Sequence, residues 1–192
     1  MIKLCLDSNC IISLELKEAS AQSIERLIQA ADAGKVAISI LGISASERQL
    51  GGGQLRNIGE FIARLERIGA SRLEILKPIG VWEVTFWDWC IFASDQDSQL
   101  LAEIHTQMSP NIRHSWPDYA AEQPVDPHDR STRAHRKWIN AHCDAQVAWA
   151  CVHYQQDALI TMNTHDFQKN ASKLFALGLK RVATPEVALT LI

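Results

Sequence analysis

The residues of this sequence best suited to chemistry are four acids: Asp7, Glu47, Asp144 and Asp166. Carboxylates that converge in one place repel each other and raise one another's pKa, so a fold that gathers them is expected to hold a cation there. Mg²⁺ and Mn²⁺ are the natural occupants because hard cations prefer oxygen ligands. One or two such ions can polarise a phosphate and generate hydroxide from water, which is the chemistry of phosphodiester hydrolysis.

Elements that position these acids follow from apolar runs. Strands are predicted at residues 2–6, 35–40, 72–76, 158–161 and 181–183. Asp7 directly follows the first strand, Glu47 lies one short turn beyond the second, and Asp166 follows the fourth. In open α/β sheets, ligands bind just beyond the carboxyl ends of the strands. Asp144 opens a helix predicted over residues 144–152, and it joins the other three if that helix begins at the same edge.

Helical spacing of apolar residues alternates with these strands. Further helices are predicted around residues 24–31, from Ser44, at 55–68, 95–108 and 171–177, and from Pro185. This alternation predicts an α/β fold with a central, mostly parallel sheet flanked by helices in three layers. We expect a single domain over residues 1–192 with a largely helical and irregular insertion at about 78–141.

Each acid also has a purely structural interpretation. Asp7 can be a turn or N-cap residue, and Asp144 can be an N-cap favoured by the helix dipole. Glu47 stands three residues after Ser44, which is the spacing of a capping box. The joint pattern favours a site, because all four acids fall near one predicted edge.

Five short motifs resemble those of PIN-domain nucleases over roughly residues 1–77 and 141–192. The motifs are Leu6-Asp7-Ser8-Asn9, Ser44-Ala-Ser-Glu47, Asp144-Ala-Gln-Val-Ala-Trp-Ala150, Thr161-Met-Asn163-Thr-His-Asp166-Phe167 and Thr184-Pro185-Glu186. The fourth is similar to the family signature Thr-x-Asn-x-x-Asp-Phe and is the most specific of them.

The resemblance implies a PIN-like three-layer fold and a Mg²⁺- or Mn²⁺-dependent ribonuclease, which in this family is often a homodimer. Many small bacterial members are VapC-type toxins held in check by an antitoxin protein. The four acids would bind the metal, and Ser8, Asn9 and Asn163 could orient ligands or bound water. The segment before Asp144 is much longer here than in such toxins.

A basic cluster lies on a predicted helix just upstream of Asp144 and comprises Arg130, Arg133, Arg136 and Lys137. It could hold an RNA backbone near the metal site, or it could be a solvated helix face paired with Asp126 and Asp129.

Several aromatic and histidine residues have two interpretations each. Trp116, Tyr119 and Trp138 could stack on unpaired bases or anchor a loop. The aromatic group from Trp82 to Phe92 is expected to pack the insertion onto the core, or to form a protein interface where it is exposed. His142 and His165 each stand beside a predicted ligand and could bind a softer metal or assist proton transfer. We favour the interpretation that they are exposed residues at helix starts.

Bulk composition limits the class of protein. A hydrophobic content of 47% and a charged content of 21% are typical of a globular protein that stays in solution, and no apolar run is long enough to cross a membrane. The net charge of -3 requires any nucleic-acid contact to come from a local patch. The five cysteines include no CxxC pair, which favours reduced, buried thiols in a cytoplasmic protein.

Two alternatives to a nuclease stay open. A PIN-like module could bind RNA or protein without cutting. A phosphatase with an aspartate nucleophile is a third class, although Asn9 replaces the second acid of the usual Asp-x-Asp pattern.

Overall fold

A five-stranded, all-parallel sheet forms the centre of the computed structural model, which describes residues 1–45, 55 and 57–192. The strand order is β3-β2-β1-β4-β5. The strands are β1 (Ile2–Leu6), β2 (Val36–Leu41), β3 (Glu74–Leu76), β4 (Ala158–Ile160) and β5 (Val182–Ala183). The predicted α/β fold with a parallel sheet is confirmed, and each strand lies within two residues of its predicted bounds.

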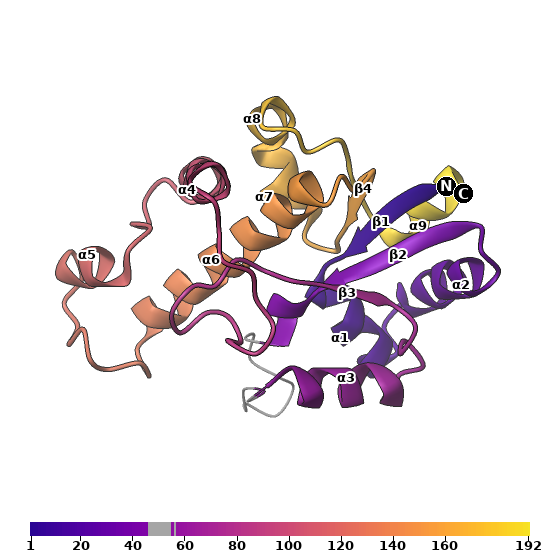
Figure 1. The fold of residues 1–192 in the computed structure, drawn as a ribbon, viewed down its shortest axis with the longest axis horizontal. Helices are drawn as coiled ribbons and strands as arrows, with labels where there is room; N and C mark the ends of the chain where they lie inside the picture. Colours follow the sequence, from indigo (N-terminus) through magenta and orange to yellow (C-terminus); the bar gives the residue numbers. More distant parts are fainter. Residues whose placement is uncertain (46–54, 56) are drawn as a thin grey trace.

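Helices connect the strands and cover the sheet (Figure 1). The α-helices are α1 (Ser8–Leu16), α2 (Ala21–Asp32), α3 (Ile58–Arg67), α4 (Asp95–Met108), α5 (Trp116–Ala121), α6 (Arg133–His153), α7 (Thr164–Lys169), α8 (Ala171–Ala176) and α9 (Pro185–Ala188), and short 3-10 helices span Gly42–Ala45 (η1) and Leu189–Leu191 (η2). The helix predicted to begin at Ser44 continues into residues 46–54, which lie outside the described residues.

Three layers follow from the alternation of side chains along the strands. Leu4 and Leu6 of β1 face a hydrophobic cluster formed with α1, α2, α3 and α9, whereas Cys5 faces a second cluster formed with α4, α5, α6 and α8. The two sets of helices lie on opposite faces of the sheet (Figure 1). Both faces of the sheet are therefore covered, as parallel sheets require.

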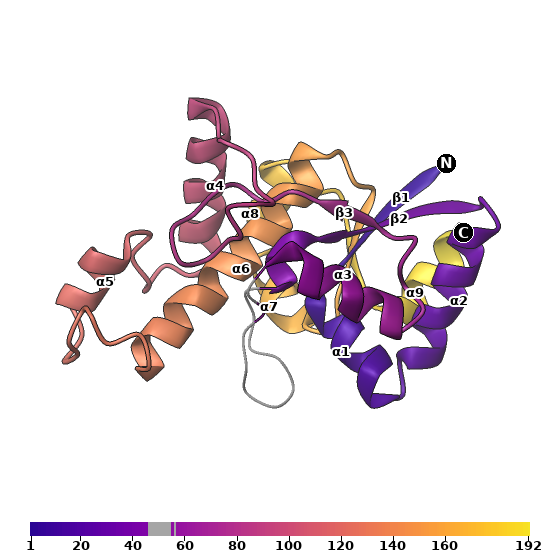
Figure 2. The same cartoon turned by 60° about the horizontal axis from the view of Figure 1, so that its bottom comes forward.

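Helix α6 is one continuous helix, whereas the sequence predicts two, one that carries the basic cluster and a second that opens at Asp144. It begins at Arg133 rather than at Asp144, because the Thr132 hydroxyl accepts a hydrogen bond from the His135 N–H and caps the helix. The prediction that Asp144 opens a helix is therefore wrong. Figure 2 shows α4, α5 and the first half of α6 extending away from the sheet.

A loop of residues 79–91, which we name the aromatic loop, follows β3. Backbone hydrogen bonds close it, from Gly80 N–H to Ile91 O (2.9 Å) and from Ile91 N–H to Pro78 O (2.8 Å). The buried Gln146 amide of α6 holds its base, accepting from Ile79 N–H (3.1 Å) and donating to Ile79 O (2.9 Å). Helix α6 therefore fixes where the loop begins.

The aromatic loop reaches the carboxyl end of β2. Trp89 packs so closely on Gly42, the first residue of η1, that a Cβ at this position would lie 2.8 Å from the Trp89 Cδ1. The expected packing of the aromatic group on the core is confirmed for Phe86 and Trp89, while Trp82, Trp87 and Phe92 are exposed.

Two expectations about composition can be compared with the fold. Cys5, Cys10, Cys143 and Cys151 are buried free thiols, as predicted, whereas the free thiol of Cys90 is only partly buried. None of the helices in the described ranges combines the length and the apolar composition that crossing a bilayer requires.

Candidate functional site at the ends of β1 and β4

Asp7 lies at the junction of β1 and α1. Its N–H donates to Ile160 O (2.9 Å), which continues the ladder between β1 and β4 by one residue. Its side chain then accepts from the Ser8 N–H and caps α1. The predicted N-cap is therefore confirmed, and it places the carboxylate at the carboxyl edge of the sheet.

Protein donors surround the Asp7 carboxylate, which is only 4% exposed. Oδ1 accepts from Ser8 N–H (2.7 Å) and from Ser8 Oγ (3.3 Å). Oδ2 accepts from Asn9 Nδ2 (2.7 Å) and from Thr161 Oγ1 (2.7 Å). Because the four donors approach both oxygens, the orientation of the carboxylate is fixed.

Thr161 is the hub of this network and was not among the predicted site residues. Its hydroxyl donates to Asp7 and accepts from Asn9 Nδ2 (2.9 Å) and from Asn163 N–H (3.0 Å). A hydroxyl offers one donor and two acceptor positions, so Thr161 uses all of them. The signal in the sequence was its place at the end of the strand that pairs with β1.

Asn9 joins α1 to the segment after β4. Its amide N–H groups donate to Asp7 and Thr161, and its Oδ1 accepts from Met162 N–H (3.0 Å). The predicted role of Asn9 as an orienting residue agrees with these contacts.

Asp166 lies in the first turn of α7, at the exposed end of the same network. Asn163 Nδ2 donates to its Oδ2 (2.9 Å), and His165 Nδ1 lies 3.5 Å from its Oδ1. Its side chain is 60% exposed. The hydrogen bond from Asn163, followed by that from His165, lowers the pKa of Asp166, so the carboxylate is ionised at neutral pH.

The pKa of Asp7 is shifted in the opposite direction from that of Asp166. Burial raises its pKa, although hydrogen bonds from Thr161, Ser8 and Asn9 act to lower it. Within the described part of the chain, no cationic side chain forms an ion pair with Asp7. Buried charges are normally paired with an opposite charge or coordinate a metal, so this carboxylate is suited to a cation.

The other two predicted acids lie differently. Asp144 is half-buried in the interior of α6, which packs against both η1 and β4. Glu47 lies outside the described residues. The hydrogen-bonded network thus joins Asp7, through Thr161 and Asn163, to Asp166.

We tested the predicted Mg²⁺ or Mn²⁺ site against the residues present. Among residues 1–45, 55 and 57–192, no group of three or more histidine, cysteine or acidic side chains is arranged to hold a metal ion. The donors that the network does provide are carboxylate oxygens, which is the ligand chemistry of these hard cations. The residues therefore fit such an ion in two respects. The donor atoms are of the type that the ion prefers, and the buried Asp7 carboxylate forms no ion pair with a cationic side chain among the described residues.

The histidines beside the predicted ligands differ from each other. His165 is exposed near the start of α7, as predicted. The same interpretation is wrong for His142, which is fully buried within α6.

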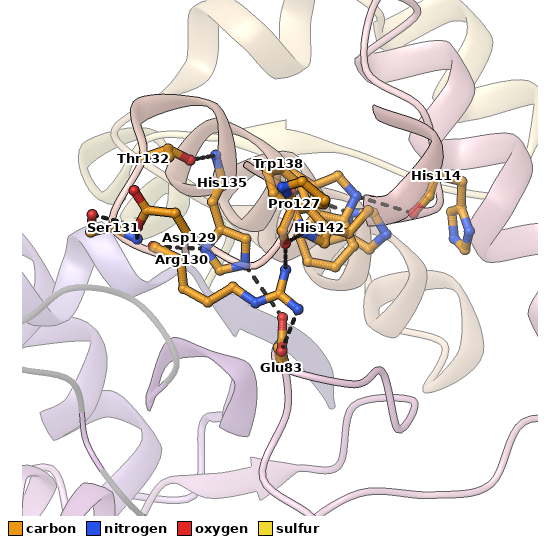
Figure 3. A network of polar contacts seen from close by, with 11 residues as sticks. Glu83, His114, Pro127, Asp129, Arg130, Ser131, Thr132, His135, Trp138 and His142 are labelled. Carbon is orange, nitrogen blue, oxygen red and sulfur yellow. Dashed lines mark hydrogen bonds and ion pairs between the residues drawn. The ribbon is translucent and has the colours of Figure 1, made fainter. Parts of the chain in front are cut away.

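The four residues of the basic cluster differ in their contacts. Arg130 Nη2 forms an ion pair with Glu83 (2.9 Å), and its Nη1 donates to Pro127 O (3.0 Å), as Figure 3 shows. Arg136 Nη1 donates to Ser131 O. Arg133 and Lys137 are exposed on the first turns of the helix.

The interpretation of Trp116, Tyr119 and Trp138 as stacking surfaces for bases is wrong. All three side chains are at least 95% buried in the cluster between α4, α5 and α6. The indole N–H groups donate to backbone carbonyls, Trp116 to Pro127 O (2.9 Å) and Trp138 to His114 O (3.2 Å). They anchor the segment between α4 and α6.

No protein-family model, curated protein or solved structure matches this chain.

Proposed function

We propose that this chain is a Mg²⁺- or Mn²⁺-dependent ribonuclease of PIN-like type whose centre is Asp7. The observation that carries the proposal is a carboxylate that is buried, oriented by four donors and unpaired with any described cation. A protein that needed only an N-cap at this position would gain nothing from burying the charge. The homodimer and the antitoxin implied by the resemblance belong to the same proposal.

Asp7 and Asp166, together with Asp144 and Glu47, are the residues that would hold the metal. When bound, such an ion supplies Lewis acidity to a phosphate and lowers the pKa of water. Thr161 and Asn9 keep the Asp7 carboxylate in one orientation, so its oxygens need no rearrangement on ligand binding. Asp166 extends the network to solvent, where a phosphodiester can approach, and its lowered pKa keeps it ionised.

A second candidate, a PIN-like module that binds without cutting, is favoured by one observation. The Asp7 oxygens already accept four hydrogen bonds from the protein, which a purely structural carboxylate would also do. In that case the site would bind no metal.

Calorimetric titration with Mn²⁺ separates the two candidates. We expect the wild type to bind Mn²⁺, and Asp7→Asn to weaken binding by at least about tenfold because a ligand charge is lost. Asp157→Asn is the matched control, since Asp157 pairs with Lys180 at the opposite edge of the sheet. Equal affinity in wild type and Asp7→Asn, or no binding by the wild type, would contradict the proposal.

A further inference from the structure

The exposed cations at the start of α6 follow a line that runs along the helix to Asp144. Arg133, Lys137 and Asn140 are exposed, and Asp144 is half-buried further along. Because an α-helix makes one turn in about 3.6 residues, side chains at these four positions project within a sector of about 60°. We name these four residues the α6 stripe. Its cations therefore stand in line with an acid of the proposed metal site.

The opposite side of the same half of α6 is buried. His135, Trp138 and His142 are each at least 94% buried. The same helical spacing places these three side chains on the side facing away from the stripe. Figure 2 shows this half of α6 extending away from the sheet. Its solvent-exposed side therefore consists of the stripe and of Arg136, which is exposed beside it.

The three exposed cations, Arg133, Arg136 and Lys137, form no ion pair with an acidic side chain among the described residues. Asp126 and Asp129 precede the helix, and each accepts a hydrogen bond from the backbone N–H two residues further on (2.9 and 2.8 Å). Both carboxylates are thus held within their own turns and do not pair directly with the three cations.

Positive side chains in the first turns of α6 run against the helix dipole. The amino end of a helix carries partial positive charge, so acids stabilise it there and cations do not. Helix α6 has no acidic residue in its first turn and carries all three cations in its first two turns. Because the whole chain has a net charge of -3, this placement does not follow from a basic composition. An anion bound to this face would offset the repulsion from the dipole and among the cations.

We propose that the α6 stripe is a phosphate track, on which Arg133 and Lys137, with Arg136 beside them, hold an RNA backbone that runs along the helix to Asp144. The choice of RNA rests on the proposed function, since the contact itself requires only a chain of phosphates. At a rise of about 1.5 Å per residue, Lys137 lies about 10 Å and Arg133 about 16 Å from Asp144 along the helix axis. Contacts to phosphates carry no sequence information, so the track positions the RNA without selecting its bases.

Fluorescence anisotropy with a labelled single-stranded RNA, in EDTA to prevent cleavage, tests this proposal. We expect the double variant Arg133→Gln/Lys137→Gln to weaken binding about tenfold at about 0.1 M salt. The slope of log affinity against log salt should fall in magnitude by about 1.4, because each phosphate contact to a single strand contributes about 0.7. Glutamine is a good helix former, so the circular dichroism of the variant should stay native.

Arg26→Gln/Lys35→Gln is the matched control. It removes the same charge from an exposed residue of α2 and from an exposed residue that precedes β2, at the amino edge of the sheet. Because these positions lie away from the track, RNA affinity should change by less than about twofold.

Asn140 tests the direction of the track, because it lies between Lys137 and Asp144 on the stripe. Asn140→Asp places a negative charge in the path of the phosphates, and we expect it to weaken RNA binding by at least about threefold. Asn140→Gln leaves the position uncharged and should bind RNA as the wild type does.

Four results would overturn the proposal: unchanged affinity in Arg133→Gln/Lys137→Gln, an equal loss in the control pair, unchanged affinity in Asn140→Asp, or a wild type that binds no RNA at low salt. The last result would turn attention to an acidic protein as the partner of this face. Because binding is measured without metal, a wild type that binds RNA through the stripe but never cuts it would refute the proposed function alone.

Discussion

Asp7 is at once the N-cap of α1 and a buried carboxylate, and these two features act in opposite directions on the stability of its charge. As the N-cap of α1 it must remain next to the Ser8 N–H, and as a buried group it loses the hydration that stabilises its charge. Hydrogen bonds from Thr161, Ser8 and Asn9 offset part of this loss, yet the pKa stays raised. A bound cation would supply the remaining stabilisation, and this is the physical basis of the proposed site.

Thr161→Val removes the central hydroxyl and leaves the shape of the side chain. We expect the free energy of unfolding to fall by about 1–3 kcal/mol, because Asn9 and Asn163 N–H lose an acceptor, and the pKa of Asp7 to rise further. Urea denaturation and the pH profile of cleavage measure the two effects. Thr161→Ser keeps the hydroxyl and should resemble the wild type in both; a similar loss in both variants would contradict the role of the hydroxyl.

Asp166→Asn tests the exposed end of the network. Since this side chain is 60% exposed, we expect the free energy of unfolding to change by no more than about 0.5 kcal/mol. Cleavage of RNA, by contrast, should fall by at least about a hundredfold, because the ionised carboxylate is lost. A variant that is folded and fully active would remove Asp166 from the site.

The individual residues of the network could be predicted to different extents. Asp7, Asn9 and Asn163 were predicted as site residues from short local motifs. Thr161 stands in the same motif as Asn163, but its role depends on which strand pairs with β1, because its contact with Asp7 joins residues 154 positions apart. Single-sequence patterns do not contain that pairing.

At the scale of elements, α6 links the aromatic loop to the carboxyl edge of the sheet. Its buried Gln146 holds the base of the aromatic loop. Its middle carries Asp144, and it packs against β4 and η1. One continuous helix therefore positions both the loop and the acid that the sequence singled out.

Gln146→Leu should loosen the aromatic loop. The substitution leaves the Ile79 N–H and carbonyl buried without partners, so we expect the free energy of unfolding to fall by about 2–4 kcal/mol in urea titrations. The matched change on a solvent-exposed glutamine of α4, Gln99→Leu, should cost less than about 0.5 kcal/mol. Equal costs for the two variants would show that the amide does not hold the loop.

Strands were easier to predict than the start of α6. Each strand is a short apolar run that ends at a turn residue, so its bounds are local. The first turns of α6 contain charged residues and buried aromatic residues, such as His135 and Trp138, that pack against the segment between α4 and α6. The buried residues of that half, His135, Trp138, Ile139 and His142, follow helical spacing, but two of them are histidines, which an apolar pattern does not count. The cap at Thr132 was a further usable signal.

Across the whole molecule, three histidines join the outlying helices to the core. His105 of α4, His114 and His142 of α6 are in mutual ring contact, with centroid distances of 4.4–5.2 Å. The Nε2 atoms of His105 and His142 are buried and have no hydrogen-bond partner among the residues that the structure describes. The sequence predicted neither this cluster nor the burial of His142, because both arise from how α4 docks on α6.

The stability of the protein should therefore depend on pH. Burial, reinforced by the neighbouring histidines, lowers the pKa of His142 to about 3 and that of His105 to about 4. Since these values lie below the usual 6.5, the unfolded chain binds more protons on acidification, and stability that is present above pH 6.5 is lost as the pH falls.

At pH 5, each of these two histidines should lower the free energy of unfolding by about 2 kcal/mol relative to pH 7.5. Urea titrations at the two pH values measure this change. His142→Gln should lose about 2 kcal/mol less than the wild type over the same interval. Identical pH dependence in the two proteins would show that His142 is not held neutral by its surroundings.

The measurement that tests the central claim most directly is RNA cleavage by the purified protein with Mn²⁺ or Mg²⁺, beside Asp7→Asn and an EDTA control. We predict metal-dependent cleavage that EDTA abolishes and that Asp7→Asn lowers by at least about a hundredfold while its circular dichroism stays native. Cleavage that persists in folded Asp7→Asn, or a wild type that cuts none of a varied set of RNAs with either metal, would contradict the assignment of Asp7 as the centre of a ribonuclease.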